Sequence, residues 1–389
     1  MNQINTISST GPLALILACA LAALSFGCSA DVAGTTPPGQ ALFYPTSMEL
    51  SSDGRYVYVV NSNFNQTYSS GWLSLVDLDL VLTDGTTSSE AILSREDGGQ
   101  IRIPGLGGEL AISSDGSSAL LPHRGLNARG EVMITRFDFG TDAMASCGDP
   151  DYETGFTGRE AVTDCDEDHL IRVFENGSDD LDPTIMPREL TVAGQLENAY
   201  HSTSFTWTDA DGSAREMVAI GYVTSGSVRF YEYSQGTYSF VDVLQTPLAV
   251  TGRLGFHPTA EEPFLIAGGG YNNVSQLCSI NLVRSFSESD EAVYSHSLPS
   301  NGGRKIYAFD FTPDGKDLLV VNRSGLATGS PGTDSFANSL VRLDASLQRA
   351  TEQTDSGEWD DNALRPAMTV KDTALLDGRA TDVKAFTKA

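Results

Sequence analysis

The sequence has little positive charge. Its 389 residues include 24 Lys and Arg against 51 Asp and Glu, which gives a formal net charge of -27 at pH 7, and only five of the basic residues are Lys. Because an acidic surface repels phosphate backbones and anionic lipid headgroups, this balance argues against binding to nucleic acid and against a basic membrane-binding patch. We therefore expect no nucleic-acid partner and interpret the acidity as a solvated surface.

The short motifs of many cofactor and catalytic sites are also missing. The chain has no CxxCH for c-type haem, no GxSxG nucleophile elbow, no Walker loop and no GxGxxG after a strand. Its five histidines show no HxH or HxxxH spacing for a metal. We predict no cofactor, and we expect a binding role more than an enzymatic one.

Charge is absent from residues 1–27 altogether, and residues 11–27 are small and apolar. This apolar stretch is short for a permanent transmembrane helix, so it is predicted to be an export signal. Gly27-Cys28 resembles a bacterial lipobox, which implies that 1–27 is a lipoprotein signal peptide and that Cys28 carries lipid. A plain secretory signal cut near Ala20 to Ala23 is the alternative.

Residues 28–40 are predicted to be a flexible tether between the lipid and the folded domain, because they are small, polar and rich in proline. The lipobox resemblance implies an outer-membrane lipoprotein in the cell envelope of a Gram-negative bacterium, which faces the periplasm or the cell surface. Its membrane contact is expected to be the lipid anchor only.

Cysteines are few, and Cys147, Cys165 and Cys278 are the ones expected in the mature domain. Cys147 and Cys165 bracket an aperiodic polar insertion at 147–165, so we predict that they form a disulfide, because thiols tend to pair in an oxidising compartment. Cys278 lies in an apolar alternation and is predicted to be a buried, reduced thiol. The insertion also offers weak oxygen ligands for Ca²⁺, with a solvated acidic loop as the alternative: Asp149, Asp151, Asp164 and Asp166.

The sequence does contain a repeated strand-turn-strand unit. Residues 48–54, 110–116 and 309–315 each place two apolar residues at period 2, then a Ser or Thr, and then an Asp-Gly turn pair, and 254–260 is a looser copy. A further β-rich run follows each turn, at 55–60, 117–121, 263–267 and 316–321. A third run closes most units, at 72–78, 131–138, 227–233 and 340–344. No sustained helical periodicity occurs between 42 and 345, so the pattern indicates a radial all-β repeat fold.

The residues Ser51-Ser-Asp-Gly-Arg-Tyr-Val-Tyr-Val-Val-Asn61 and Thr312-Pro-Asp-Gly-Lys-Asp-Leu-Leu-Val-Val-Asn322 resemble the repeat of the YVTN-type β-propeller family. This resemblance implies a β-propeller of seven blades, each with four antiparallel strands. Six blades with long insertions is the alternative. We expect residues 41–389 to form this single domain.

Candidate ligand-binding residues follow from the blade geometry. His123, Arg124 and Arg323 come after second strands, and their loops open on one face. Innermost strands line a central channel with every second residue, which gives a second candidate set: Glu49, Glu109, Arg253 and Asp310. This set is expected to form either a water-filled structural charge network or a site for a small ligand or a cation.

From these residues we predict a binding or scaffold module that acts through the face of its second-to-third-strand loops. Its partner is expected to be an envelope protein or a small anionic ligand, which the arginines would attract. The alternative is a propeller hydrolase that resembles lactonases, whose catalytic residues the sequence does not identify.

Overall fold

The computed structural model describes residues 37–63, 67–68, 70–83, 85–87, 89–126, 132–148, 163–172, 199–208, 212–222, 226–246, 253–257, 264–271, 274–282, 293–297, 304–324, 338–353 and 359–376. The regular structure in these ranges is β except for the helix α2 (Leu78–Val81), the 3-10 turn η1 (Glu167–His169) and a single helical residue, Leu282. The predicted signal peptide, Cys28 and most of the predicted tether lie outside the described residues.

Five antiparallel sheets follow one another along the chain. The first sheet contains β1 (Pro45–Leu50), β2 (Tyr56–Asn61), β3 (Gly71–Asp77) and β4 (Gln100–Ile103). The second contains β5 (Ala111–Ile112), β6 (Ser118–Leu126), β7 (Val132–Phe139) and β8 (Ala145–Ser146), and β9 (Leu170–Arg172) also pairs with β7. The third contains β10 (Ala199–Thr208), β11 (Ala214–Tyr222), β12 (Ser227–Ser234) and β13 (Thr237–Gln245).

The last two sheets keep the same order. The fourth contains β14 (Leu254–Phe256), β15 (Phe264–Tyr271), β16 (Val274–Asn281) and β17 (Val293–Ser297). The fifth contains β18 (Arg304–Phe311), β19 (Asp317–Ser324), β20 (Asn338–Asp344) and β23 (Thr369–Leu376). A separate hairpin of β21 (Leu347–Gln353) and β22 (Trp359–Pro366) lies in the chain between the third and fourth strands of this last sheet, and the repeat pattern in the sequence does not predict it.

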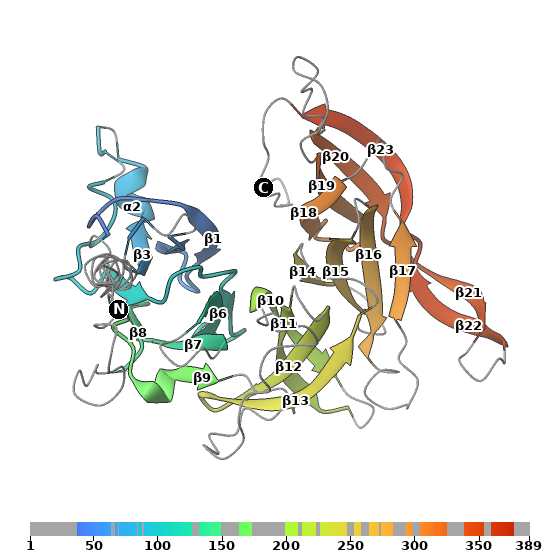
Figure 1. Ribbon diagram of the computed structural model, residues 1–389, viewed down its shortest axis with the longest axis horizontal. Helices are drawn as coiled ribbons and strands as arrows, with labels where there is room; N and C mark the ends of the chain where they lie inside the picture. The colour runs from blue at the N-terminus through green and yellow to red at the C-terminus, as the bar shows by residue number, and fades with distance from the viewer. Residues whose placement is uncertain are drawn as a thin grey trace, which may run out of the picture.

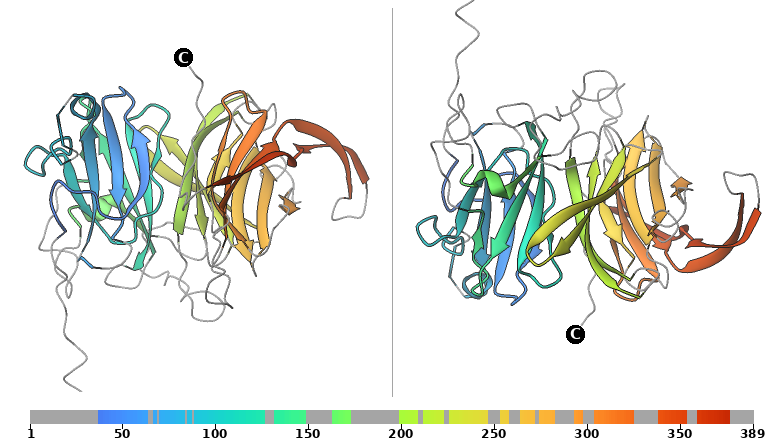
Figure 2. Two further views of the ribbon diagram at one scale, coloured as in Figure 1. Left: turned by 90° about the horizontal axis from the view of Figure 1, so that it is seen from above. Right: turned by 90° about the horizontal axis from the view of Figure 1, so that it is seen from below.

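The sheets stand side by side in an arc around a common centre, with the first strand of each sheet innermost (Figure 1; Figure 2). Radially arranged sheets of four antiparallel strands are the architecture of a β-propeller, so the predicted fold class is confirmed. The described residues contain four sheets of four strands and one, the second, in which β9 is a fifth strand beside β7. The blade count, seven or six, stays a prediction.

The repeated Asp-Gly turns have one shared geometry. In the first copy, Ser51 Oγ donates to Asp53 Oδ1 at 2.6 Å, Arg55 N donates to the same oxygen at 3.0 Å, and Gly54 has φ +73°. The second and third copies repeat these bonds around Asp115 and Asp314. These hydrogen bonds hold the pKa of each Asp below its usual value, and the positive φ explains why glycine follows the Asp.

Among the described residues, the hydrophobic core forms four clusters, and each cluster fills one junction between neighbouring sheets. Representative pairs, in chain order of the junctions, are Leu73 with Leu121, Ile134 with Val218, Phe230 with Leu265, and Leu277 with Phe309. On β1, by contrast, Met48 and Leu50 are more than half exposed. Within the described ranges, these two β1 side chains therefore do not belong to any of the junction clusters.

Hydrogen bonds also join the innermost strands around the centre. Leu110 N donates to Ser47 Oγ at 3.0 Å, Glu109 N donates to the Tyr200 carbonyl at 2.8 Å, and Ser202 Oγ donates to the Glu109 carbonyl at 2.6 Å. Close approach at this point requires glycine before Glu109, because a Cβ on Gly108 would lie 1.9 Å from the Tyr200 oxygen. These contacts fix β1, the entry to β5 and β10 against one another.

Candidate functional site

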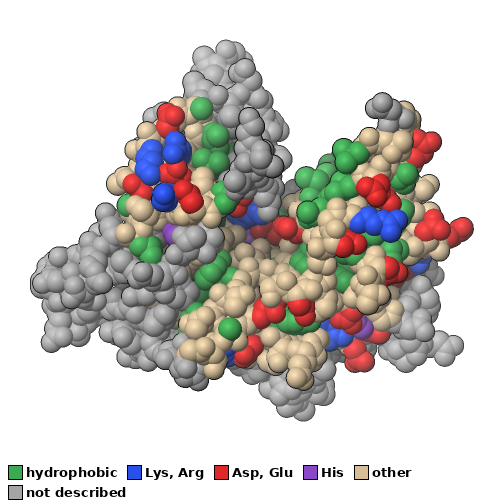
Figure 3. Space-filling view, turned by 180° about the vertical axis from the view of Figure 1, so that it is seen from behind, with side chains coloured by type: hydrophobic (Ala, Val, Ile, Leu, Met, Phe, Trp, Pro, Cys, Tyr) green, Lys and Arg blue, Asp and Glu red, His purple; other side chains and the backbone are tan. Residues whose placement is uncertain are grey.

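A cavity of about 570 Å³ lies at the centre of the arc. The innermost strands of all five sheets contribute residues to its wall, together with the turns that follow β1, β5 and β18. On the face shown in Figure 3, the molecule is hollowed between the sheet of β1 and the sheet of β18. The cavity is therefore the position where the sequence predicted a channel lined by innermost strands.

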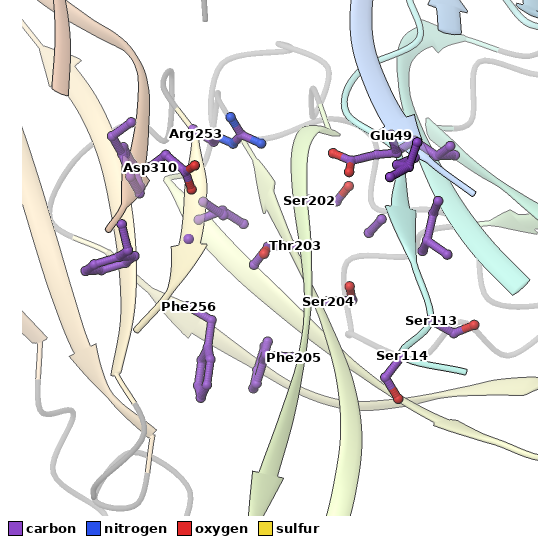
Figure 4. A pocket seen from close by; sticks show the side chains of 18 of the residues that line it. Glu49, Ser113, Ser114, Ser202, Thr203, Ser204, Phe205, Arg253, Phe256 and Asp310 are labelled. Atoms are coloured by element: carbon purple, nitrogen blue, oxygen red, sulfur yellow. The ribbon is translucent and has the colours of Figure 1, made fainter. Parts of the chain in front are cut away.

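In the part of the chain that the structure describes, three charged side chains line this cavity, and all three are residues that the sequence singled out. They are Glu49 on β1, Arg253 just before β14, and Asp310 on β18. Figure 4 shows the carboxylates of Glu49 and Asp310 directed toward the interior from opposite walls, with the Arg253 guanidinium at the same end of the cavity. The structure thus brings together residues from three sheets that are far apart in the sequence.

Glu109, the fourth predicted channel residue, lies behind this end of the cavity. Its Oε1 is 3.8 Å from Arg253 Nε, and its Oε2 is 3.2 Å from Nδ1 of His201. His201 is 4% exposed, and neither of its ring nitrogens makes a hydrogen bond among the described residues, so its contact with Glu109 is an ion-pair distance without hydrogen-bond geometry. The carboxylate of Glu109 therefore connects a buried imidazole to the arginine of the cavity wall.

The other end of the cavity is aromatic and hydroxyl-rich. Phe205 and Phe256 stack there with ring centroids 4.5 Å apart and ring planes 10° from parallel. Thr203 and Ser204 line the wall between this pair and the charged end (Figure 4). The ring of Phe309 packs against Gly255, and a Cβ added to Gly255 would lie 2.6 Å from that ring. The cavity is charged at one end and apolar at the other.

The predicted loop residues do not join this group as far as the structure describes them. His123 is fully buried, its Nε2 lies 2.8 Å from Thr135 Oγ1, and burial lowers its pKa from 6.5 to about 3. It contributes nothing to the described cavity wall. Arg124 and Arg323 fall on β6 and β19, but their side chains lie outside the described part of the structure.

The predicted disulfide is confirmed: Cys147 and Cys165 are bonded, and both are buried in the cluster between the first two sheets. Cys278 is a free thiol in the core. Of the weak Ca²⁺ candidates, Asp164 pairs with Arg95 and Arg102, and Asp166 contacts His169, whereas Asp149 and Asp151 lie outside the described residues. Among the described residues, no group of three or more His, Cys, Asp or Glu could hold a metal. The same residues include no helix of the length and apolarity that a membrane crossing requires.

Sequence reasoning missed His201 and the aromatic end of the cavity. His201 lies in a strand without the repeat's Ser/Thr-x-Asp-Gly turn spacing, and its partner Glu109 belongs to another sheet. One available signal was the dipeptide Asp211-Gly212, where Gly212 has φ +87° in the connection between β10 and β11. It marks a further strand-turn-strand unit, although it does not identify the histidine.

No family model matches this chain, and no curated protein matches it. Solved structures to which it is similar include a hydrazine synthase chain of Kuenenia stuttgartiensis, with 14% identity and a TM-score of 0.40 over 77% of this chain and 64% of that chain. A protein of Bacteroides uniformis, provisionally described as a 6-phosphogluconolactonase, has 12% identity and a TM-score of 0.41 over 86% and 89% of the two chains. The β-propeller domain of Cps50 (Swd1) from Myceliophteria thermophila has 9% identity and a TM-score of 0.38 over 85% and 89%.

This chain spans less than two thirds of the length of that hydrazine synthase chain. All three TM-scores are below 0.5. The likeness therefore carries no argument about what this chain binds or catalyses.

Proposed function

We propose that this protein is a lipid-anchored β-propeller of the bacterial cell envelope that binds a small molecule in its central cavity. The observation that carries the proposal is the cavity of about 570 Å³ whose wall comes from the innermost strands of all five described sheets. Its volume falls within the range of small-molecule sites, about 300–1,000 Å³, and few polar groups on a rigid scaffold are typical of such sites. These features favour small-molecule binding over a purely scaffolding role.

The binding role is tested by filling the cavity. Ser204 lines the wall between the charged and the aromatic ends, so Ser204→Trp should occupy the space that a ligand needs. Ser234 is exposed at the end of β12, and Ser234→Trp is the matched control. Compounds that raise the melting temperature of the wild-type protein in a library screen should lose this effect with Ser204→Trp and keep it with Ser234→Trp. Compounds that stabilise both variants equally would show that binding occurs elsewhere.

The envelope location rests on the lipobox-like Gly27-Cys28 and on the tether-like residues that follow. Several acyl chains at about 0.8 kcal/mol per buried methylene hold a protein on a membrane. We expect Cys28→Ala to shift the full chain from the detergent phase to the aqueous phase in a partitioning experiment. Retention of this variant in the detergent phase contradicts lipidation at Cys28.

A second candidate function is hydrolysis, and the observation that favours it is the Glu109–His201 pair. A carboxylate 3.2 Å from one imidazole nitrogen can orient the ring as a general base. His201 is buried behind the wall, however, and does not line the cavity, so we place binding first. Hydrolysis of gluconolactone by the wild-type protein, abolished by His201→Gln, would reverse this order.

A further inference from the structure

The stacked pair of Phe205 and Phe256 gives one end of the cavity an aromatic surface. The two ring centroids are 4.5 Å apart, and the ring planes are 10° from parallel. Phe205 is 6% exposed, whereas Phe256 is only partly buried, and both residues line the cavity. Aromatic rings attract a further ring by offset stacking or edge contact, beyond the effect of burying apolar area. This end of the cavity is therefore suited to a flat aromatic ring.

Two hydroxyl groups lie beside the aromatic pair. Thr203 and Ser204 precede Phe205 on β10 and line the wall between the two ends of the cavity (Figure 4). The neighbouring Ser202 differs, because its Oγ already donates to the Glu109 carbonyl at 2.6 Å. Within the described residues, the hydroxyls of Thr203 and Ser204 make no such bond. Since a hydroxyl can donate one hydrogen bond and accept two, this wall can bind a neutral polar group of a ligand.

The charged end of the cavity does not favour an ionised ligand. The Arg253 Nε atom lies 3.8 Å from Glu109 Oε1. Glu49, Arg253 and Asp310, the charged residues of the described wall, all take part in further interactions within the protein. A ligand ion would lose its hydration in the cavity and would have to compete with these contacts for a counter-charge. A neutral ligand avoids this cost.

We propose that the cavity takes a neutral compound that combines an aromatic ring with a hydroxyl or amide group. The ring packs on Phe256, and the polar group exchanges hydrogen bonds with Thr203 and Ser204. This inference rests on the proposed small-molecule binding and adds the ligand class. It differs from the small anionic ligand that the sequence suggested, and the two alternatives give opposite results with charged probes.

Four probes separate the contribution of the ring from that of charge: 2-phenylethanol, 2-cyclohexylethanol, 2-phenylethylammonium and 3-phenylpropanoate. Ligand-detected NMR titration of the wild-type protein should give the highest affinity for 2-phenylethanol. The saturated alcohol should bind about threefold more weakly, since it keeps the apolar surface and loses the aromatic contacts. Each charged probe should bind about tenfold more weakly than 2-phenylethanol, or worse, because its ion is desolvated without a counter-charge of its own.

Two variants assign the binding to the hydroxyl wall and to the aromatic end. Thr203→Val keeps the shape of the side chain and removes its hydroxyl, so it should weaken 2-phenylethanol by about threefold. Phe256→Leu keeps an apolar side chain and removes the ring. It should therefore weaken 2-phenylethanol and make its affinity equal to that of 2-cyclohexylethanol.

Each variant has a matched control outside the cavity wall. Thr208→Val changes an exposed threonine at the end of the same strand, β10, and Phe240→Leu changes a partly buried phenylalanine on β13. Both controls should keep the affinities of the two alcohols and the difference between them. Circular dichroism shows that the variants are folded, and the comparison of the four probes on the wild-type protein does not depend on any variant.

Three results would overturn the ligand class: a charged probe that binds as tightly as 2-phenylethanol, equal binding of the two alcohols to the wild-type protein, or an unchanged affinity for 2-phenylethanol in either Thr203→Val or Phe256→Leu. If a probe binds in any of these cases and Ser204→Trp abolishes its binding, the proposed binding function stands while the ligand class fails. If none of the four probes binds, the ligand class is also overturned, and the library screen with Ser204→Trp decides the binding function separately.

Discussion

Removal of the disulfide between Cys147 and Cys165 should destabilise the fold without rearranging its core. The two cysteines are 18 residues apart and buried in the cluster that joins the first and second sheets. In the chain-entropy model, opening a loop of this size returns conformational freedom to the unfolded chain worth about 3 kcal/mol at 25 °C. The folded side chains keep their neighbours, so the loss acts mainly through the unfolded state.

The measurement is urea denaturation followed by tryptophan fluorescence, with and without a reductant. The free energy of unfolding of the wild-type protein should fall by about 3 kcal/mol on reduction, which is more than a hundredfold in the folded-to-unfolded ratio. The double variant Cys147→Ala/Cys165→Ala should show no response to the reductant. It should also be slightly less stable than the reduced wild type, because two sulfur atoms leave the apolar cluster.

The control is Cys278→Ala, because this buried free thiol has no bond to break and the response to reductant should persist unchanged. An identical midpoint for oxidised and reduced wild-type protein would refute the entropy argument. A response that persists in the double variant would show that another thiol pair is responsible.

Two further predictions concern the junctions and the acid stability of the fold. Gly108→Ala should lower the melting temperature strongly, because its Cβ would lie 1.9 Å from the backbone oxygen of Tyr200. Gly39→Ala is the control and should leave the melting temperature unchanged, since its Cβ meets only the Gln100 amide oxygen at 3.7 Å. Equal melting temperatures of the two variants would contradict the close approach at Gly108. The imidazole of His123 remains neutral in the folded protein down to about pH 3, whereas in the unfolded chain it takes up a proton below about pH 6.5. The contribution of His123 to the free energy of unfolding is therefore complete above pH 6.5 and is lost as the pH falls toward 3. The pH slope of unfolding free energy between 6 and 4 should decrease in His123→Gln by up to about 1.4 kcal/mol per pH unit, and an unchanged slope would show that His123 does not carry this dependence.

Local chemistry explains why much of the fold could be predicted from the sequence. The runs at 55–60 and 131–138 correspond to β2 (Tyr56–Asn61) and β7 (Val132–Phe139) because period-2 alternation and Asp-Gly turns are encoded within a few residues. The hairpin of β21 and β22 was not predicted, since it extends away from the repeat and follows no turn of the same kind. The spacing of residues within the repeat therefore predicts where its strands lie, but it does not predict the structure of segments inserted between those strands.

The candidate site was predictable only in part, for a related reason. Glu49, Arg253 and Asp310 were found because a strand's position within the repeat determines which residues approach the centre. Their contacts were not foreseen, because contacts depend on which side chains from different sheets meet, as Glu109 meets Arg253 and His201. His123, which the sequence suggested as a ligand-binding residue, is instead a buried residue that forms a hydrogen bond with Thr135 within its own sheet.

The division of the core into four junction clusters also bears on how such a chain can change over evolution. Each sheet packs on its immediate neighbours, so its stability depends on those junctions and only weakly on the total number of sheets. Duplication of one strand-turn-strand unit creates a junction of the existing kind and leaves the others intact. Deletion within the row, however, would bring together two faces that never evolved to fit. Repeat units are therefore gained or lost most easily at the ends of the row. In the inner units, the sequence can change freely only in the loops.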